Sequence, residues 1–290
     1  MLSNFSDIIK LTQNKKNKIS VAVAQDAHVL EAVKIAKEQG IADFVLVGDK
    51  QKIEELTTEK FEIIHETDAA AACKIAVDLV NQGETKALMK GLVDTSVVMK
   101  AALNKEHGMR TGKNLSHIAA FEVAVYHKLL FVADAAINIA PDINTKKEIL
   151  QNCVEALNNL GLSKPKVALL AAKEKVDPKM QVTLEYEEII KDHKGGFLQE
   201  AIIDGPLALD NAVSKESCAI KGINSPVGGD ADLLFCPDIE AGNILYKSLA
   251  FLAGAKSGGV VLGAKRPIIL TSRADSTESK TISIALSLLF

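Results

Sequence analysis

The chain has 290 residues, 48% of them hydrophobic, and a formal net charge of −3 at pH 7. This length and apolar content are sufficient for one large or two medium domains, and the slightly acidic balance argues against a protein that binds the phosphate backbone of nucleic acids. Because no apolar run reaches the about 18 residues of a membrane span and the N-terminus lacks the order of a signal peptide, we expect a cytoplasmic protein without a membrane or nucleic-acid partner.

Strands and helices alternate in the first part of the chain. β-Branched runs predict strands at 19–24, 44–47 and 87–89, and helices are expected at 29–39 and from Asp68 to Gly83. Lys90 and Gly91 follow the third strand, and Asp94 to Ser96 open a further helix. Repeated strand–helix units of this spacing form a mostly parallel sheet with helices on both faces, so the predicted fold class is α/β.

This pattern changes at the runs 118–125 and 129–132, which are separated only by Tyr126, His127 and Lys128. A connection this short cannot hold a crossover helix, so the pair is predicted to be antiparallel. Beyond it the α/β pattern resumes, with a helix at 146–160, strands at 167–170, 201–203 and 233–235, and a helix at 241–253. We therefore expect two α/β domains, the first formed by residues 1–130 and 266–290 and the second by 131–265.

The strongest local signal for a site lies near the end of the chain. Apolar runs at 260–262 and 268–270 predict buried strands, and the second leads into Thr271, Ser272 and Arg273 before a helix at 276–289. Ligands of open α/β sheets bind beyond the carboxyl ends of strands, and a helix N-terminus there attracts anions. The planar fork of Arg273 suits two oxygens of a phosphate group. The sequence thus predicts a site for phosphate or carboxylate.

The same region resembles a known family. The runs 272–276, 226–232 and 237–247 resemble the phosphate acyltransferases, which include phosphotransacetylase and phosphate butyryltransferase. Residues 89–95, 107–110 and 115–117 are more similar to the butyryltransferase branch than to the acetyl branch. The resemblance implies reversible transfer of a butyryl or branched acyl group between coenzyme A and inorganic phosphate. It also implies an architecture like that of isocitrate and isopropylmalate dehydrogenases with a cleft between the domains, a homo-oligomer, and acyl-CoA and phosphate as substrates without a bound cofactor.

The resemblance assigns catalytic roles at the second strand end. Residues that match Ser272 and Arg273 belong to the active site in the family, and the Arg binds substrate. The acetyl branch has a proposed Asp base at the position of Ser279, which carries no carboxylate here, so Glu278 is the available substitute. Asp275 and Glu278 also fit a capping box with Asp275 as the N-cap, which would explain both residues without chemistry.

Other residues are candidates for binding substrate: Lys90, Gly91, Thr95, Lys100, Arg110, Gly242, Asn243 and Asp275. The turn from Lys90 to Thr95 joins a strand to a helix and suits an anion. Lys100 matches a substrate-binding Arg of the acetyl branch, although a helix Lys is as readily a solvated charge. The two residues at 242 and 243 either let coenzyme A approach the backbone or simply form a turn.

The four cysteines are far apart and lack a CxxC spacing, which fits inert thiols in a reducing compartment. No spacing of His and carboxylates predicts a metal site. The residues leave alternatives open: a phosphate acetyltransferase, an acyltransferase that uses acyl carrier protein, a metal- and NAD-dependent decarboxylating dehydrogenase of related fold, which would need clustered Asp ligands, and a ligand-binding protein without catalysis.

Overall fold

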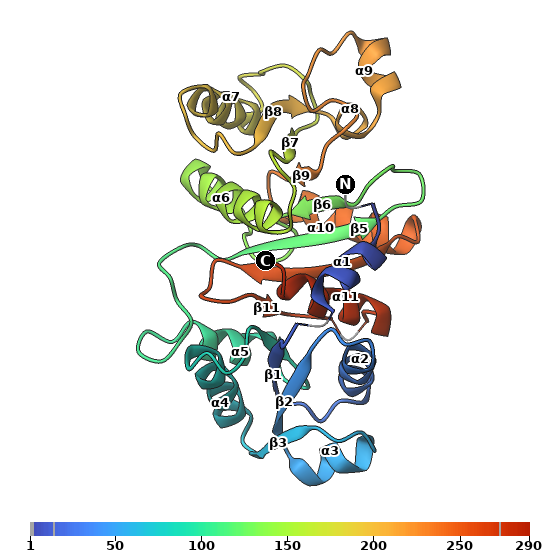
Figure 1. Ribbon diagram of the computed structural model, residues 1–290. Helices are drawn as coiled ribbons and strands as arrows, with labels where there is room; N and C mark the ends of the chain where they lie inside the picture. Colours follow the sequence, from blue (N-terminus) through green and yellow to red (C-terminus); the bar gives the residue numbers. More distant parts are fainter. Residues whose placement is uncertain (1–2, 14, 273) are drawn as a thin grey trace. The chain divides into compact units, whose positions relative to one another are not determined.

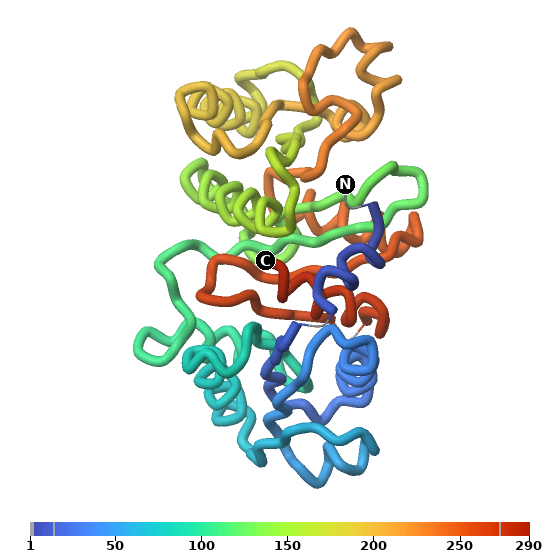
Figure 2. The backbone as a smooth tube through the Cα atoms, in the orientation of Figure 1, coloured from blue at the N-terminus to red at the C-terminus, as the bar shows by residue number. Residues whose placement is uncertain are grey.

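The computed structural model describes residues 3–13, 15–272 and 274–290, so the predicted ligand Arg273 lies outside the described residues. The chain divides into two compact units. We call Phe5–Lys113 with Ser257–Phe290 the terminal unit, and Asn114–Lys256 with the chain's first residues, up to Asn4, the central unit. Figure 2 shows the blue-to-cyan and red segments of the chain that together build the terminal unit.

The terminal unit contains a sheet in the order β3-β2-β1-β4-β11-β10 (Figure 1). Its strands are β1 (Lys18–Ala22), β2 (Asp43–Gly48), β3 (Glu62–His65), β4 (Leu88–Lys90), β10 (Lys256–Leu262) and β11 (Ile268–Ile269). All neighbours pair in parallel except β10, which runs antiparallel to β11. The parallel strands are almost continuously apolar, as expected for strands covered on both faces, and β1, β4 and β11 end at the same edge.

Helices cover both faces of this sheet. They are α1 (Phe5–Thr12), α2 (Ala27–Glu38), α3 (Lys50–Leu56), α4 (Ala69–Asn81), α5 (Thr95–Ala102) and α11 (Thr277–Ser287). Helix α11 packs against α1 and α2, whereas α4 packs against α5 (Figure 1). Local sequence sets several helix starts, because the side chains of Asp26, Asp49 and Asp68 each accept a backbone N–H of the first turn. The predicted α/β class and the N-cap at Asp68 are confirmed.

The central unit contains strands in the order β5-β6-β9-β7-β8. Their bounds are β5 (Ser116–Glu122), β6 (Leu130–Ala133), β7 (Lys166–Leu170), β8 (Ile202–Leu207) and β9 (Leu233–Phe235). The antiparallel pairing predicted for the first two strands is confirmed, with Ile118 opposite Ala133, and the other neighbours are parallel. Because β5 and β6 pair along their length, both lie in one unit, and the units change at residue 114 rather than at the predicted 131.

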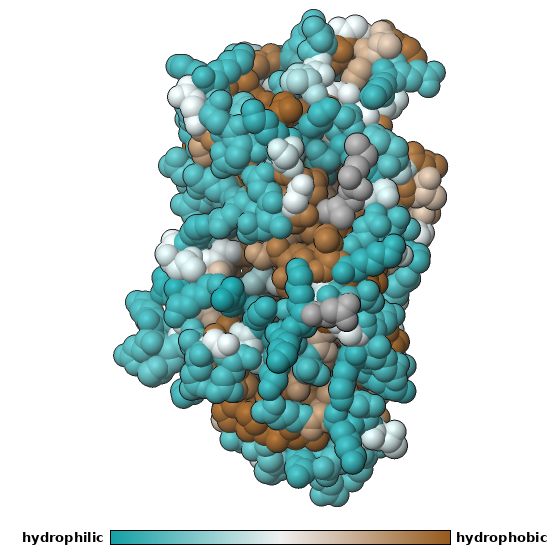
Figure 3. Space-filling view, in the orientation of Figure 1, coloured by the Kyte–Doolittle hydropathy of each residue, from teal (hydrophilic) through white to brown (hydrophobic). Residues whose placement is uncertain are grey.

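Helices of the central unit are α6 (Ile143–Asn159), α7 (Gln181–Lys194), α8 (Leu209–Val213), α9 (Lys215–Lys221) and α10 (Ile239–Lys247), which continues into a π-helical turn, η1 (Ser248–Leu252). The face of α6 seen in Figure 3 is hydrophilic, while its other face is buried. Within the described ranges, no helix combines the length and apolar character that a membrane crossing needs.

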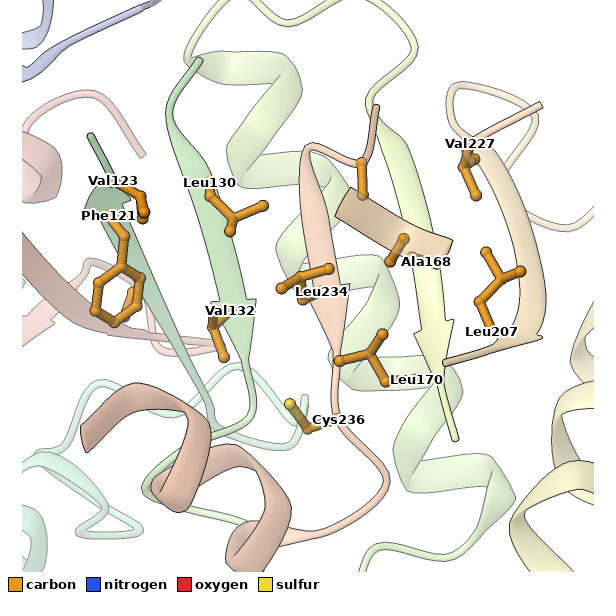
Figure 4. Close-up of a cluster of buried hydrophobic side chains, with 13 residues drawn as sticks. Phe121, Val123, Leu130, Val132, Ala168, Leu170, Leu207, Val227, Leu234 and Cys236 are labelled. Carbon is orange, nitrogen blue, oxygen red and sulfur yellow. The ribbon is translucent and has the colours of Figure 1, made fainter. Parts of the chain in front are cut away.

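A hydrophobic cluster on one face of the central sheet holds this unit together (Figure 4). Each strand contributes to it: Phe121 from β5, Val132 from β6, Leu234 from β9, Ala168 from β7 and Leu207 from β8. Helix α10 covers this face, and its Tyr246 packs edge-on against the Phe121 ring with 5.2 Å between centroids. Burying an aromatic or aliphatic side chain of this size contributes about 1.5–3 kcal/mol, so the cluster is a main source of the unit's stability.

Candidate anion site at the carboxyl edge of the terminal sheet

A cavity of about 270 Å³ lies at the edge where β1, β4 and β11 end. The residues that line it come from the segments that follow these strands and from α11: Asp26, His28, Val29, Lys90, Gly91, Thr271, Ser272 and Lys280. All of them belong to the terminal unit. The structure therefore brings the two predicted strand ends, 90–91 and 271–272, to one cavity, as expected for parallel strands whose carboxyl ends share an edge.

The β4 end of the cavity is built on a very close backbone approach. Gly91 donates its N–H to the carbonyl of Ala22 at 2.8 Å, and a Cβ on Gly91 would lie only 2.2 Å from the carbonyl oxygen of Val23. Only glycine fits against β1 in this way. Lys90, the last residue of β4, is 9% exposed, and its Nζ lies 3.3 Å from the carbonyl oxygens of Gly91 and Val93. The turn thus holds a nearly buried ammonium group at the cavity.

The β11 end is a loop whose shape depends on Asp275. The carboxylate of Asp275 accepts the backbone N–H of Ser272 at 2.7 Å, and the Ser272 hydroxyl oxygen accepts the N–H of Ala274 at 3.2 Å. The Ser272 side chain lines the cavity, and its hydroxyl group can both donate and accept hydrogen bonds. The loop therefore contributes a hydroxyl group to the cavity lining.

The predicted capping box at Asp275 and Glu278 is wrong. Helix α11 begins at Thr277, and its N-cap is Ser276, whose Oγ accepts the N–H of Ser279 at 3.0 Å. The carboxylate of Asp275 is bound to the Ser272 N–H instead, so a serine takes the cap one residue later. Glu278 lies exposed in the first turn of α11, where a carboxylate interacts favourably with the helix dipole.

Lys280 is a cavity residue that sequence reasoning missed. It lies on the buried face of α11 and is 2% exposed, and its Nζ donates to the carbonyl oxygen of Asp275 at 2.5 Å. Burial lowers the pKa of this ammonium group, while the nearby carboxylates of Asp275 and Asp26 act in the opposite direction. A lysine placed four residues before Ile284, within the apolar face of the last predicted helix, was the available signal.

The other predicted binding residues lie elsewhere. Among the described residues, Thr95 at the start of α5, Lys100 in its last turn and Arg110 opposite Ala264 are exposed and belong to the terminal unit, but they are not part of the cavity lining. Gly242 and Asn243 lie on α10 and so belong to the central unit.

Gly242 is a packing position within the central unit. It is buried, and a Cβ there would lie 2.0 Å from the carbonyl oxygen of Asp134. Asn243 beside it donates from its side-chain amide to the carbonyl of Ala135 at 3.2 Å. Close packing at Gly242 and the hydrogen bond from Asn243 therefore hold α10 against the segment that follows β6.

Burial lowers the reactivity of most of the cysteines. All four are buried, and burial raises the pKa of Cys73 to about 11 and that of Cys236 to about 12. The Cys153 thiol also has a raised pKa because it is fully enclosed. Since the thiolate is the reactive form, Cys73, Cys153 and Cys236 are poor nucleophiles. In the described part of the chain, no group of three or more His, Cys, Asp or Glu side chains is placed to hold a metal ion.

A second charged cluster, in the central unit, surrounds Asp230. Its carboxylate pairs with Lys166 at 2.5 Å, Lys128 at 3.0 Å and His127 at 2.8 Å. Burial would raise the pKa of the Asp230 carboxyl, but hydrogen bonds from Lys166, Lys128 and His127 outweigh burial and hold this pKa well below its usual range. Lys128 also pairs with Asp232 at 2.6 Å. The cluster lies at the starts of β6, β7 and β9. Its basic side chains pair with the carboxylates of Asp230 and Asp232, so the charges are balanced within the cluster.

Fold and cavity together define an α/β protein with a cavity at the carboxyl edge of a parallel sheet, where two lysines and two hydroxyl side chains form a candidate anion site. The chain matches the family described as Phosphate acetyl/butaryl transferase over residues 3–71 and 56–288. It belongs to this family.

Relatives from several bacteria resemble the chain over almost its full length. Phosphate butyryltransferase of Clostridium acetobutylicum is 43% identical, covering 100% of this chain and 98% of the relative. Phosphate acetyltransferase of Thermotoga maritima is also 43% identical, with 98% of each chain covered. The crystal structure of a branched-chain phosphotransacylase from Enterococcus faecalis matches with a TM-score of 0.87 and 36% identity, covering 94% of this chain and 98% of that one.

The architecture extends to dehydrogenases, as expected from the sequence. The structure of 4-hydroxythreonine-4-phosphate dehydrogenase from Klebsiella pneumoniae matches with a TM-score of 0.57 at 13% identity, covering 94% of this chain and 98% of that one. At this identity the likeness concerns the fold alone.

Proposed function

We propose that this protein catalyses reversible transfer of a short-chain acyl group, butyryl or a branched equivalent, between coenzyme A and inorganic phosphate. The observation that carries the proposal is the similarity over the whole chain to phosphate butyryltransferase. The branched-chain phosphotransacylase of similar structure supports the same acyl size. A cavity with two buried lysines and two hydroxyl side chains supports a site for phosphate.

The reaction needs no covalent bond to the protein. In the direction of acyl phosphate synthesis, a phosphate oxygen attacks the carbonyl carbon of the thioester, and a C–O bond forms as the carbonyl oxygen gains negative charge. When this oxyanion collapses, the C–S bond breaks, coenzyme A leaves as its thiolate, and the proton lost by phosphate neutralises it. Acyl-CoA and phosphate thus yield acyl phosphate and CoA. The buried cysteines, among which Cys73 and Cys236 have raised pKa values, fit this direct route.

Stabilising the oxygens that carry charge is the main task of such a site. In this proposal Ser272 donates its hydroxyl hydrogen to the carbonyl oxygen or to phosphate, and Lys90 supplies a positive charge; both residues line the cavity. We assign Arg273, one residue beyond Ser272, to the same phosphate group. Glu278 is our candidate for the base that accepts the proton, since it lies in the first turn of the helix that borders the cavity.

We further propose that the enzyme acts in the cytoplasm as a homo-oligomer, with acyl-CoA and phosphate as its only small-molecule partners and no bound cofactor.

The decisive experiment measures release of the free CoA thiol from butyryl-CoA, with and without inorganic phosphate. We expect release that requires phosphate and yields butyryl phosphate in equal amount. Release without phosphate would indicate a hydrolase, and no release with any acyl-CoA would overturn the proposal. Parallel assays with NAD and with EDTA test the dehydrogenase alternative, which predicts NAD reduction and inhibition by the chelator.

Acetyl transfer is the second candidate, because a phosphate acetyltransferase matches at the same identity as the butyryl enzyme. Values of kcat/KM for acetyl-CoA and butyryl-CoA at saturating phosphate separate the two. A higher value for acetyl-CoA would change the acyl group assigned here and leave phosphate-dependent transfer in place.

A further inference from the structure

Lys280 borders the cavity, yet it belongs to none of the motifs on which the family resemblance rests. It comes from the buried face of α11, eight residues beyond Ser272 in the sequence. Both residues line the same cavity. Ile284, four residues further along the same face of α11, is fully buried. An apolar side chain at position 280 would therefore suit this helix face at least as well as a lysine. The presence of a charged side chain here needs an electrostatic reason.

The described residues supply only part of the hydrogen bonding that a buried ammonium group requires. Such a group carries three donors, and within the described residues Lys280 Nζ has one hydrogen-bond acceptor, the carbonyl oxygen of Asp275. Burying a charge is costly unless it is paired. Burial indeed lowers the pKa of Lys280. Lys280 lines the cavity, where a bound anion would complete the pairing.

The cavity's charges favour an anion with several oxygens. Lys90 and Lys280 are both nearly buried there, and the carboxylate in the lining is that of Asp26, whose Oδ1 accepts the N–H of Val29. The Asp275 carboxylate also lies near Lys280, and it accepts the N–H of Ser272. Hydroxyl groups of Thr271 and Ser272 add neutral donors. Lysine binds phosphate as a point charge, and two such charges from different elements, β4 and α11, suit a tetrahedral anion better than a single carboxylate. The second carboxylate oxygen of Asp26 is an acceptor for a hydrogen bond from a protonated phosphate oxygen.

We propose that Lys280 binds a phosphate oxygen directly, so that inorganic phosphate, or the phosphoryl group of the acyl phosphate, is held between Lys90 and Lys280. This inference rests on the proposed function, in which phosphate is a substrate. It adds a ligand from inside the last helix to the ligands at the strand ends. The hydrogen bond from Lys280 Nζ to the carbonyl oxygen of Asp275 fixes this lysine relative to the loop that carries Ser272, because the Asp275 carboxylate accepts the N–H of Ser272.

The substitution Lys280→Met tests this role, since Met keeps the length of the side chain and removes its charge. We expect the KM for phosphate to rise about 10- to 100-fold, the range for loss of a hydrogen bond between charged groups, and the KM for butyryl-CoA to stay within about twofold of wild type. Isothermal titration calorimetry of the free wild-type and variant enzymes with inorganic phosphate should show the same loss of affinity in the variant, independently of turnover. Lys280→Arg, which retains the charge, should partly restore both the KM for phosphate and the affinity for phosphate.

Lys146→Met is the matched control. Lys146 is likewise buried, at 5% exposed, and it donates to the carbonyl oxygen of Pro141 at 2.8 Å and to Glu185 at 2.5 Å in the central unit. Its loss should lower thermal stability but leave the affinity for phosphate unchanged. The control therefore separates the cost of removing a buried lysine from the loss of a ligand.

Each outcome gives a distinct answer. If the KM and the affinity for phosphate are unchanged in Lys280→Met, the inference is overturned, even if kcat falls. The proposed function would still stand in that case if the wild-type enzyme catalyses phosphate-dependent acyl transfer. A rise confined to the KM for butyryl-CoA would place Lys280 at the phosphates of coenzyme A and also overturn it. Absence of phosphate-dependent transfer in wild type would instead refute the function itself.

Wild-type protein provides a test that does not depend on the variant's folding. Backbone hydrogen exchange is measured by mass spectrometry with and without inorganic phosphate. Binding should slow exchange in a peptide that covers residues 277–283, the first turns of α11. Slower exchange at the β4 end alone, with residues 277–283 unaffected, would contradict the role of Lys280.

Discussion

The close approach at Gly91 offers a quantitative test of how the cavity is built. In Gly91→Ala the new Cβ would lie 2.2 Å from the carbonyl oxygen of Val23 and 2.8 Å from that of Ala22. Because unstrained contacts of this kind need about 3.5 Å, the turn must move by about 1 Å. The hydrogen bonds from Gly91 N to Ala22 O, at 2.8 Å, and from Leu92 N to Val23 O, at 2.7 Å, then exceed the usual range.

The expected cost combines overpacking and weakened backbone hydrogen bonds, about 1–3 kcal/mol of unfolding free energy. This corresponds to a fall of about 2–10 °C in Tm for a chain of this size. Since Lys90 moves with the turn, we expect kcat/KM for butyryl-CoA and phosphate to fall about 10²-fold, measured well below the Tm.

Gly195→Ala is the control for this experiment. Gly195 ends α7 at φ −82°, a conformation open to alanine, and the nearest atom to a new Cβ, the carbonyl oxygen of Asp192, lies 3.3 Å away. Stability should change by no more than about 0.5 kcal/mol and activity should not change. Wild-type stability and activity in Gly91→Ala would refute the reasoning, because the backbone at the cavity would then tolerate a shift that the geometry forbids.

Other expectations concern the base, the acyl group and acid stability. Glu278→Gln leaves the Ser276 cap intact and removes only the interaction of the carboxylate with the helix dipole, so we expect Tm to fall by no more than a few degrees and kcat to fall about 10²-fold or more; unchanged turnover would remove Glu278 from the mechanism. Butyryl-CoA should exceed acetyl-CoA in kcat/KM by about 15-fold, from two buried methylenes of about 0.8 kcal/mol each, with isobutyryl-CoA similar to butyryl-CoA. The lowered pKa of Asp230 stabilises the fold above the unfolded-state pKa of about 3.9, and this contribution is lost as the pH falls further. Asp230→Asn should therefore lower the unfolding free energy by about 1–3 kcal/mol at pH 7 and flatten its acid dependence in urea titrations; a parallel pH profile would contradict this.

Strand positions and the edge that carries the site were predictable because both follow from short, contiguous patterns. The apolar runs at 44–47 and 233–235 became β2 and β9. Lys90 and Ser272 each follow such a run, and parallel pairing of β4 with β11 brings them to one edge. By contrast, α7 was missed because its sequence, rich in Glu and Lys, buries only Thr183, Tyr186 and Ile189.

The start of α11 shows why local rules fail where two of them compete. Asp275 and Ser276 are both good N-cap residues, and sequence alone favours Asp275 because Glu278 follows at capping-box spacing. In the folded chain the Asp275 carboxylate is taken by the N–H of Ser272, so the cap passes to Ser276. The choice depends on the shape of the preceding loop, which no pattern of spacing records.

Lys280 shows a related limit, since helix pattern and site pattern give opposite interpretations of the same residue. Taken as part of a surface helix, a lysine is a solvated charge. The helix is instead buried along 280–287, so the same lysine becomes a charge enclosed beside a cavity. The carbonyl partner that the described residues supply does not offset the loss of water around the ammonium group. In our proposal a substrate anion shares the enclosed charge, so part of the free energy that burial of Lys280 costs the fold is recovered as binding energy for phosphate.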